Sequence, residues 1–597
     1  MFLLERFSNM TVDQLTKYMA LCGGGKSAPR KADRVDFLIR TLSSRQEIAR
    51  LWREMDDLSR KAVAVAYHND GHFNEDAFVA QYGSLPERPK HKWSWERNLI
   101  VVDLFIHGET LPPQIMVNLA DLVPEPERFQ LTGSQEIPAE EVDSRQHPIP
   151  QTVALRQEAG RHDLLLFLSL AAQGALKFSK TNGRLTPKGV ETILGQLQEG
   201  EFAAEFINKD GSNREIKKID ESICLFGLNT FAAQAGLLDK EGNLTTEGQS
   251  YLATEDPALL LEALETWTHN GLFDELTRIG ALRGLRAKGI DLTDPAMRRE
   301  KVVEALSWCP VGEWISIPDF YRAVKVWHFD FEVEEGGLDK IYAGYRYGRD
   351  GWYEDWAEED SAWKITTGLN INVILWETLA SIGALDIIYA PEADDVFPAE
   401  TYNYDESTYS DYDGLLYFRI NPLGAYLFGQ SGDFAPARPL DAALFEIDND
   451  GVVRVLAPGG LSPVHHAQMD PMSDSTAEAK GGITRYRLSK QKLLTILESE
   501  ADLSMQRGFL AQRNNGPLPA AVEAFLDQTE ADSTAVQEKS RMFTVQVRSD
   551  ELAQAILDDP VAGKLARALD SRTLLILESK KTAFRKALKE MGFGLKG

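Results

Sequence analysis

The segment ALCGGGKS, from Ala20 to Ser27, has the residue types and spacing of a permissive phosphate-binding loop. In a functional loop a buried strand precedes the glycines and a helix follows the lysine, so that backbone amides and the helix dipole converge on a phosphate. Here the preceding VDQLTKYMAL has helical periodicity, and Pro29 follows close behind. The apolar run LIVVD, ending at Asp103, has no second carboxylate beside it for magnesium and water. We therefore expect no nucleotide hydrolysis and no nucleotide cofactor.

The histidines and cysteines are not spaced as metal ligands. His68 and His72 are four residues apart, but a pair of ligands there would need a helix through Gly71 and a third ligand, and the local Asn-Asp-Gly favours a turn. The cysteines are far apart and odd in number, which predicts neither a disulfide framework nor a zinc site: Cys22, Cys224 and Cys309. No pair of carboxylates stands at a spacing that catalysis demands. The sequence therefore predicts no catalytic residue, no metal and no cofactor.

Charge is distributed unevenly along the chain, whose formal net charge is −27 over 597 residues. DNA affinity depends on Lys and Arg that displace condensed counterions, so this total argues against a protein covered by phosphate-binding surface. Residues 1–100 nevertheless hold 16 Lys and Arg against 13 Asp and Glu, whereas residues 330–413 hold 21 acids against 4 bases. One end of the chain is therefore suited to meet nucleic acid, and the middle is suited to repel it.

Two predicted helices within Met10–Leu42, joined by a glycine-rich basic turn, would position the N-terminal cations. The pair resembles a SAP-type DNA-binding module. Its cations cluster where the second helix begins and are the first set of candidate DNA-binding residues: Lys26, Arg30, Lys31 and Arg34. An ordinary solvated helical hairpin that caps the N-terminus is the alternative interpretation.

Three segments repeat one pattern, in which an apolar helix ends near a glycine and a Thr or Asn turn leads to another Gly and a second apolar run. They lie at Leu168–Leu194, Leu228–Leu252 and Leu379–Phe428. The order helix, short strand, turn, then strand or helix is typical of a winged helix, and repeated units bury their apolar faces on one another. When a winged helix binds DNA, a helix enters the major groove and the wing touches phosphates.

Charge distinguishes the first two wings. The first carries four cations, which form the second set of candidate DNA-binding residues, although lysines also serve simply to solubilise an exposed hairpin: Lys177, Lys180, Arg184 and Lys188. The second wing is acidic through Asp239, Glu241 and Glu247. Phosphate contact there would be repulsive, so packing or protein contact is its expected use.

The acidic stretch from 330 to 413 is also rich in aromatic residues and is expected to be an insertion. Aromatic side chains are over-represented at the centres of protein interfaces, and acids steer a basic partner toward them. The candidate partner-binding residues are Tyr345, Tyr347, Trp352, Tyr353 and Trp356. The alternative is a solvated loop whose aromatic residues anchor it to its own core.

After Pro439 the pattern changes. DAALFEIDNDGVVRVLAP predicts a hairpin around Asn449–Gly451, because Asn-Asp-Gly suits a tight turn between alternating apolar residues. A short strand and three helices follow, with a break at Gly516–Pro519, and the end of the chain predicts strand, helix, strand, helix.

From Leu444 to Phe593 the chain resembles the helicase-associated domain named for the N-terminal part of XPB/Ssl-type DNA repair helicases. The resemblance rests on the opening hairpin, YRLS before an apolar helix, RGFL with GPLP, and VRSD with a final helix ending in MGFG. It implies a small damage-recognition-like module that accompanies a motor. The motor's phosphate loop, Asp–Glu pair and arginine motif have no convincing counterpart here, so ATPase and helicase activity are not implied.

These observations predict a mainly α fold with small β elements (α+β), built from tandem winged-helix-like modules and a small C-terminal α/β domain. The expected divisions are a helical N-terminal domain at 1–123, a linker at 124–160, winged-helix-like modules at 161–255 and 256–435, the helicase-associated hairpin and helices at 440–540, and the last domain at 541–597.

The expected function is that of a noncatalytic DNA-binding or helicase-associated accessory protein in bacterial DNA repair or defence against foreign DNA, a setting that the resemblance alone implies. The alternative is an acidic scaffold or DNA mimic that binds a helicase or nuclease partner without touching DNA. No apolar run approaches the length that spans a bilayer, and Glu5 and Arg6 interrupt any secretory core, so no membrane partner and a cytoplasmic location are expected.

Overall fold

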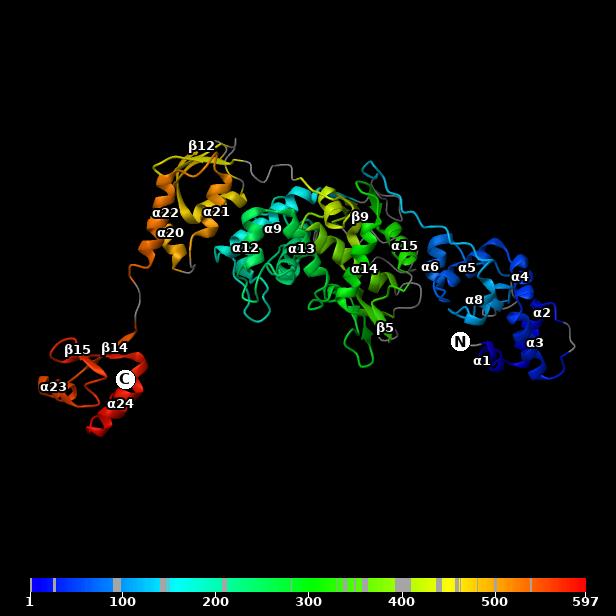
Figure 1. Cartoon of the computed structure of the whole chain (residues 1–597), viewed down its shortest axis with the longest axis horizontal. Coiled ribbons are helices and arrows are strands. Elements are labelled where there is room, and N and C mark those ends of the chain that lie inside the picture. The colour runs from blue at the N-terminus through cyan, green and yellow to red at the C-terminus, as the bar shows by residue number, and fades with distance from the viewer. Residues whose placement is uncertain are drawn as a thin grey trace. The chain divides into compact units, whose positions relative to one another are not determined.

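The structure is a computed structural model of the whole chain (Figure 1). It describes all residues except 1–2, 25–27, 90–97, 140–147, 149, 207–211, 281, 329, 337–340, 348–350, 357–362, 392–409, 436–442, 457–460, 462, 480–481, 499–501, 537–539 and 597, and it describes only the backbone at 335–336, 342–347, 351–356, 463, 477–479 and 482–484. Two compact units are present: unit 1 is Met1–Ala442 with Leu461–Gln468, and unit 2 is Ala443–Gly460 with Met469–Gly597. Helices predominate over small antiparallel sheets, which confirms the expected mainly α fold with small β elements.

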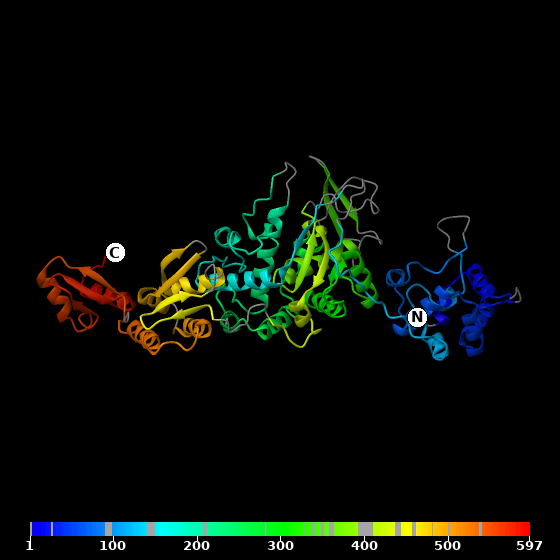
Figure 2. The ribbon, with the colours of Figure 1, turned by 90° about the horizontal axis from the view of Figure 1, so that it is seen from above.

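The N-terminal helices of unit 1, blue in Figures 1 and 2, surround one apolar core. Side chains at their starts fix where several of them begin: Thr11 and Gln14 form a capping box, and Asp56 and Asn74 accept from backbone N–H groups. The elements are α1 (Leu3–Ser8), α2 (Val12–Leu21), α3 (Lys31–Ser43), α4 (Arg45–Glu54), α5 (Asp57–His68), α6 (Glu75–Tyr82), α7 (Val102–Phe105) and α8 (Pro113–Leu119). The predicted helix pair is thus α2 and α3.

The three sequence repeats share one local structure. In each, a helix ends at a glycine with positive φ, a short hairpin follows, and a capped helix begins. The first helices are α9 (Arg156–Ala172), α11 (Cys224–Gln234) and a continuous stretch made of η5 (Lys364–Gly368), α17 (Leu369–Val373) and η6 (Ile374–Ala380). The second helices are α10 (Pro187–Leu194), α12 (Thr246–Thr254) and α18 (Pro422–Leu427).

In each repeat the side chain that caps the second helix also binds the backbone near the end of the first helix. It donates a hydrogen bond back to a carbonyl oxygen near the end of the first helix: Thr186 to Lys177 at 3.0 Å, Thr245 to Gly236 at 2.6 Å and Asn421 to Gly383 at 2.9 Å. Three residues after each cap stands a glycine whose Cβ, if it had one, would press on a carbonyl oxygen of the preceding segment: Gly189, Gly248 and Gly424. In each repeat, therefore, the recurring Thr or Asn and the Gly allow the start of the second helix to lie close against the backbone that follows the first helix.

The third repeat belongs to a complete winged helix. Its elements follow in the order α14 (Pro295–Ser307), β4 (Trp314–Ser316), α15 (Ile317–Trp327), the Lys364–Ala380 stretch, β8 (Leu385–Tyr389) and β9 (Leu415–Ile420). The strands form an antiparallel sheet in the order β1-β8-β9-β4, which β1 (Thr152–Ala154) completes. Residues 390–414 join β8 to β9 in the position of the wing.

Between the repeats and around this module lie shorter elements: η1 (Phe202–Glu205), η2 (Ile219–Glu221), α13 (Pro257–Thr268), η3 (Glu275–Arg278), β2 (Leu282–Arg283), β3 (Asp291–Leu292), β5 (Glu334–Gly336), β6 (Tyr342–Tyr347), β7 (Gly351–Trp356) and η8 (Asp411–Gly414). Sheet β2-β6-β7 contains the β6–β7 hairpin, and β3 pairs with β5.

Two sequence expectations about boundaries are wrong in part. The expected linker 124–160 contains β1 and the start of α9, and Ser134 exchanges two backbone hydrogen bonds with Trp314 of β4 at 2.9 and 2.7 Å. The expected insertion 330–413 contains the Lys364–Ala380 helix and β8, which are core elements of the winged module. Segments rich in Pro, Gln or acid looked like connections because sequence composition does not report which backbone groups find partners across the fold.

Unit 2 contains two antiparallel sheets with helices. The first sheet, in the order β10-β11-β13-β12, is followed by three helices, and the second, β14-β16-β15, is combined with two. The elements are β10 (Phe445–Ile447), β11 (Val452–Val455), η9 (Asp470–Met472), β12 (Ser473–Ala479), β13 (Gly482–Leu488), α20 (Lys490–Leu497), α21 (Ser504–Arg513), α22 (Ala520–Ser533), β14 (Met542–Gln546), α23 (Asp550–Asp558), β15 (Ala566–Ala568), β16 (Thr573–Leu577), η10 (Glu578–Lys580) and α24 (Lys581–Glu590). Between β11 and η9 the chain forms α19 (Pro463–Met469), which belongs to unit 1 except for Met469. The β10–β11 hairpin is confirmed, and the last module has one strand, β15, more than expected.

Candidate nucleic-acid interface

The helix that would enter a DNA groove in this winged module is inside the protein. Every residue from Ile365 to Ala390 is buried. Helix α11 presses on it so closely that a Cβ at Gly227 would overlap the carbonyl oxygen of Glu377, and a Cβ at Gly160 of α9 would overlap the backbone at Gly383. The first helices of the three repeats therefore pack against one another at glycines, and this face of the third helix has no room for a nucleic acid.

A buried ion pair reinforces this packing. Arg278 of η3 donates to Glu377 at 2.7 Å, and the Tyr412 hydroxyl donates to the same carboxylate. Burial raises the pKa of Glu377 to about 7, although Arg278 opposes the shift. Because Glu377 is only 1% exposed, no substrate can reach it, and the pair ties η3 and η8 to the central helix rather than forming an acid–base site.

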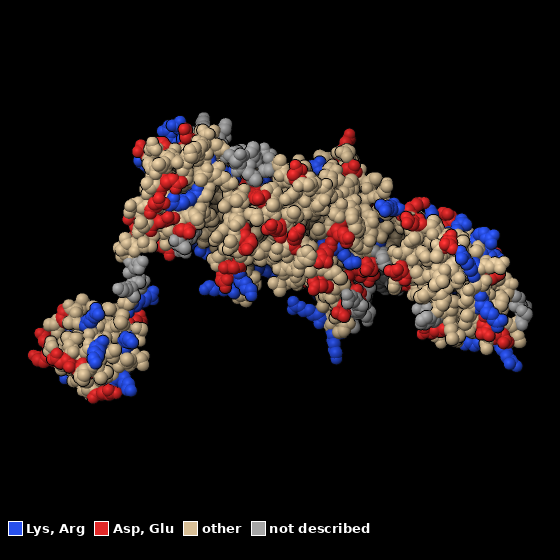
Figure 3. All heavy atoms as spheres, viewed as in Figure 1, with Lys and Arg blue, Asp and Glu red and all other residues tan. Residues whose placement is uncertain are grey.

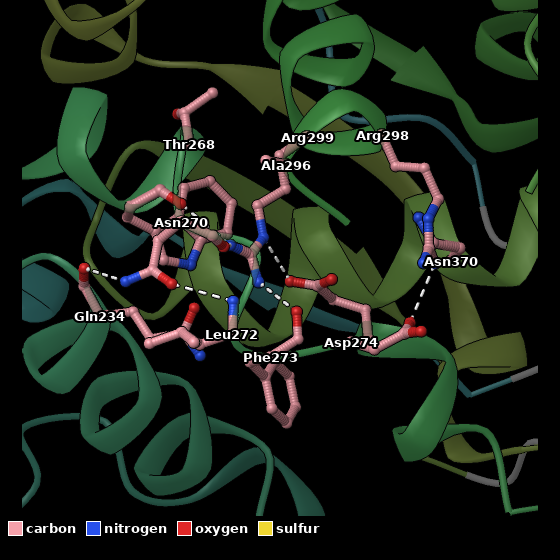
Figure 4. A network of polar contacts seen from close by, with 12 residues as sticks. Gln234, Thr268, Asn270, Leu272, Phe273, Asp274, Ala296, Arg298, Arg299 and Asn370 are labelled. Atoms are coloured by element: carbon pink, nitrogen blue, oxygen red, sulfur yellow. Dashed lines mark hydrogen bonds and ion pairs between the residues drawn. The ribbon is translucent and has the colours of Figure 1, made fainter. Parts of the chain in front are cut away.

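Two more arginines, neighbours on α14, hold a second buried network (Figure 4). Arg299 donates to Glu275 at 2.7 Å and to the carbonyl oxygens of Trp267 and Phe273 at 2.9 Å each. Arg298 donates to Asp274 at 2.9 Å and to the Asn370 side chain at 3.0 Å. Both guanidinium groups donate hydrogen bonds to residues at the start of η3 or in the loop before it. Their charges therefore serve to hold the fold together.

Two of the predicted N-terminal cations donate hydrogen bonds to backbone carbonyl oxygens of the neighbouring helices and turn. Lys26 lies outside the described residues. Lys31 donates to the carbonyl oxygen of Ser8 at 2.8 Å, and Arg34 donates to that of Ala28 at 3.0 Å and that of Val12 at 3.2 Å. Of the described cations in this set, Arg30 is exposed with only its backbone engaged, through Asp33. Arg34 therefore links the two helices of the pair, and Lys31 links α3 to α1.

A cavity of about 620 Å³ lies beside the same turn. It is lined by Cys22, Asp33 and Glu47 among others, and the element before the glycines is helix α2 rather than a strand. Carboxylates at its wall would repel a nucleotide phosphate. Asp103, considered from the sequence for nucleotide chemistry, accepts hydrogen bonds from the two terminal guanidinium nitrogens of Arg88 at 2.7 and 2.8 Å.

Two of the four cations at the first wing bind other parts of the fold that the structure describes, and two do not. Lys177 donates to the carbonyl oxygen of Gly174 at 2.8 Å, and Arg184 pairs with Asp220 at 2.6 Å. Lys180 and Lys188 are exposed, and neither forms an ion pair with any residue that the structure describes. These two lysines are thus the part of the predicted set that is open to a ligand.

The second wing packs on the first, in line with its expected use. A Cβ at Gly242 would overlap the ring of Phe178, and the carbonyl oxygen of Lys240 lies 3.4 Å from the Cβ position of Gly183. Asp239 accepts the backbone N–H groups of Glu241 and Asn243 at 2.9 Å each, so this acid closes its own turn. The exposed Lys240 adds a third cation to the paired wings.

The predicted partner-binding residues lie on one hairpin. Tyr345 pairs in register with Tyr353, and the same ladder places Tyr347, Trp352 and Trp356 on β6 or β7. Their side chains are outside what the structure describes. Trp363, from the same aromatic stretch, packs edge-on against Tyr321 and donates to the carbonyl oxygen of Phe331 at 3.1 Å, which is an anchoring role within the fold.

Sequence reasoning missed a row of arginines on the first sheet of unit 2. Arg485 lies directly opposite Arg454 on the neighbouring strand, and Arg487 follows two residues later on the same exposed face. Figure 3 shows Lys and Arg atoms gathered on the side of the unit on which β12 lies. The spacing of two residues between the arginines of RYRL indicates that Arg485 and Arg487 share one face of a strand. That Arg454 lies on the same face follows only from the pairing of the strands.

His68 and Cys22, considered from the sequence as possible ligands, are held within the fold. His68 closes α5 with its Nε2 3.1 Å from the carbonyl oxygen of Pro124, and burial raises the pKa of Cys22 to about 12. Across the described part of the chain, no three His, Cys, Asp or Glu side chains are grouped to hold a metal ion. Nor does any described helix combine the length and apolarity needed to cross a bilayer.

The paired wings of unit 1 therefore carry cations that have no carboxylate partner among the described residues, whereas Arg454 of the arginine row lies 3.9 Å from Glu446. Comparison of the sequence with models of known protein families and with curated proteins found no match.

Proposed function

We propose that the protein is a noncatalytic accessory protein that binds DNA through its phosphate backbone, without reading base sequence. The observation that carries this proposal is the contrast within the first repeat: its first helix, α9, is buried at 159–161 and 163–171, whereas Lys180 and Lys188, which flank its wing, are exposed and form no ion pair with any described residue. A wing without a reading helix contacts phosphates but not base edges, and phosphate contacts carry no sequence information.

The biological setting is proposed from the C-terminal resemblance. A helicase-associated, damage-recognition-like module in the same chain as DNA-contacting wings suits a cytoplasmic protein that accompanies a helicase or nuclease in DNA repair or in defence against foreign DNA. The hydrolytic work would then belong to the partner, because α2 precedes the glycines of ALCGGGKS and Asp103 is bound by Arg88.

Fluorescence anisotropy on two DNA duplexes of unrelated sequence tests the proposal. We expect similar affinities for both, and an affinity that falls steeply with salt. The variant Lys180→Gln/Lys188→Gln should make the slope of log K against log salt shallower by about two units, since each lost phosphate contact removes about 0.9.

The matched control removes two cations that already have carboxylate partners, Arg45→Gln/Arg572→Gln, which pair with Asp121 and Asp550. It changes the net charge equally and should keep the parent's slope. Absence of binding at low salt would refute DNA binding, and a strong preference for one sequence would refute backbone-only contact.

A second candidate function is that of an acidic scaffold or DNA mimic, and the charge of residues 330–413 favours it. Deleting that whole segment would unfold unit 1, because Lys364–Tyr389 lies in the core. The informative variant instead neutralises the acids around β7 with Asn and Gln: Glu354, Asp355 and Glu358–Asp360.

If this surface binds a basic protein partner, the neutralised variant should lose partners that copurify with the parent, while its DNA affinity stays equal or rises. A control that neutralises five exposed acids on other elements should keep the partners: Glu191, Glu262, Glu265, Glu300 and Glu498. Equal recovery of partners by both variants would contradict the scaffold function.

A further inference from the structure

Helix α24 at the end of unit 2 carries a row of cations on its exposed side. Phe584, Ala587 and Leu588 are buried against the second sheet and fix the rotation of the helix. One exposed flank of the helix presents Lys581, Arg585 and Lys589, which are four residues apart and therefore lie in one line. We name these three residues the α24 stripe; the exposed cations Lys580 and Lys586 lie beside it.

No residue that the structure describes forms an ion pair with any cation of the α24 stripe, and the same is true of Lys580 and Lys586. Elsewhere in the same module Arg572 does have such a partner, Asp550, at 2.5 Å. The ammonium group of Lys581 lies over the ring of Phe543, 5.1 Å from the ring centroid, which is a cation–π contact and not an ion pair.

This arrangement is unfavourable for the isolated helix. Like charges four residues apart repel, and a cation in the first helical turn opposes the helix dipole. A ligand that carries negative charge along a line would remove both penalties.

The charge of the module also points to an anionic ligand. Residues 541–597 hold 11 Lys and Arg against 7 Asp and Glu, within a chain of net charge −27. The stripe spans about 12 Å, from eight residues at 1.5 Å each, and one DNA strand presents a phosphate every 3.4 Å or so along the axis. About three phosphates therefore face the stripe.

A protein partner fits this face less well. Protein interfaces are organised around buried aromatic and apolar residues. The large hydrophobic residues that are exposed in the described structure include none on α24, whose outer side is formed by Lys, Arg, Thr, Ala and Glu.

We propose that the α24 stripe is a second nucleic-acid site, which binds the phosphodiester backbone in addition to the wings of unit 1. The inference rests on the proposed DNA-binding function and adds a site that the first wing does not need. Binding at two sites linked in one chain raises the effective concentration of the second for the same DNA, so the loss of either should weaken a long duplex more than a short one.

The test uses the full chain and the triple variant Lys581→Gln/Arg585→Gln/Lys589→Gln. A control removes three other cations of the same module, Lys564→Gln/Arg567→Gln/Arg572→Gln, and so matches its charge. With a 40-base-pair duplex we expect the stripe variant to bind at least tenfold more weakly than the parent in 100 mM salt. Its slope of log K against log salt should be shallower by about 2.7 units.

The control should bind within threefold of the parent, and circular dichroism should give the parent's helix content for both variants. The inference is overturned, with DNA binding intact, if the parent binds the duplex and the stripe variant keeps its affinity and slope. DNA binding itself fails if the parent does not bind the duplex at any salt. If the parent and the stripe variant differ on heparin but not on DNA, the stripe takes another polyanion and the assignment to nucleic acid is wrong.

Discussion

Replacing Arg299 by Met should lower the stability of unit 1 by about 3–5 kcal/mol, which is the usual effect of removing one partner from a buried ion pair. Arg299 is 0% exposed and donates to Glu275 and to the carbonyl oxygens of Trp267, Asn270 and Phe273, so the variant leaves a carboxylate and main-chain acceptors buried without donors. Calorimetry should show the transition of unit 1 about 3–5 °C lower, because the unfolding entropy of so large a unit is about 0.9 kcal/mol/K.

The control is Arg286→Met, at an exposed arginine of the same unit, and should change stability by less than about 0.5 kcal/mol. Arg299→Lys should recover only part of the loss, because an ammonium group cannot reach the four acceptors that the guanidinium fork serves. The double variant Arg299→Met/Glu275→Leu should be more stable than Arg299→Met alone, since it removes the uncompensated carboxylate. An unchanged transition in Arg299→Met would show that the network does not hold this loop.

The stability of unit 1 should fall as the pH rises from about 4.5 to about 7, and Glu377 should be responsible for about 3 kcal/mol of the fall. A pKa that differs by 1 between the folded and unfolded states changes the free energy of unfolding by about 1.4 kcal/mol. Burial raises the pKa of this carboxyl from 4.5 to about 7 in the folded protein. Between these values the folded state keeps a proton that the unfolded state has released. The stability due to the protonated group is therefore complete below pH 4.5 and is lost as the pH passes 7.

The measurement is the difference between the parent and Glu377→Gln in the melting temperature of unit 1, taken from pH 4 to 8. The amide does not titrate, so the parent should lose stability relative to the variant only within that window. The ion pair raises the pKa of Arg278, which therefore stays charged throughout and does not add a second step. A constant difference across the whole range would contradict the raised pKa.

Local features of the chain were predictable from the sequence because they depend on neighbouring residues. The capping box of Thr11 and Gln14 starts α2 where the helical pattern begins, and the Asn-Asp-Gly turn, with Gly451 at φ +71°, joins β10 to β11. The three repeats were visible because each needs a capping Thr or Asn and a glycine three residues later for the same close backbone approach. Such constraints act over a few residues and leave a direct trace in the sequence.

Tertiary packing decided which of these elements are available for binding. The helix from Lys364 to Ala380 has a length and position like those of a groove-reading helix, but Gly227 and Gly160 let α11 and α9 cover it. Arg34 and Arg184 looked like phosphate ligands until their acceptors, Val12 and Asp220, were placed beside them. Burial and pairing depend on residues that are distant along the chain, so composition and periodicity alone could propose the cations but could not separate those held by the fold from those open to a ligand.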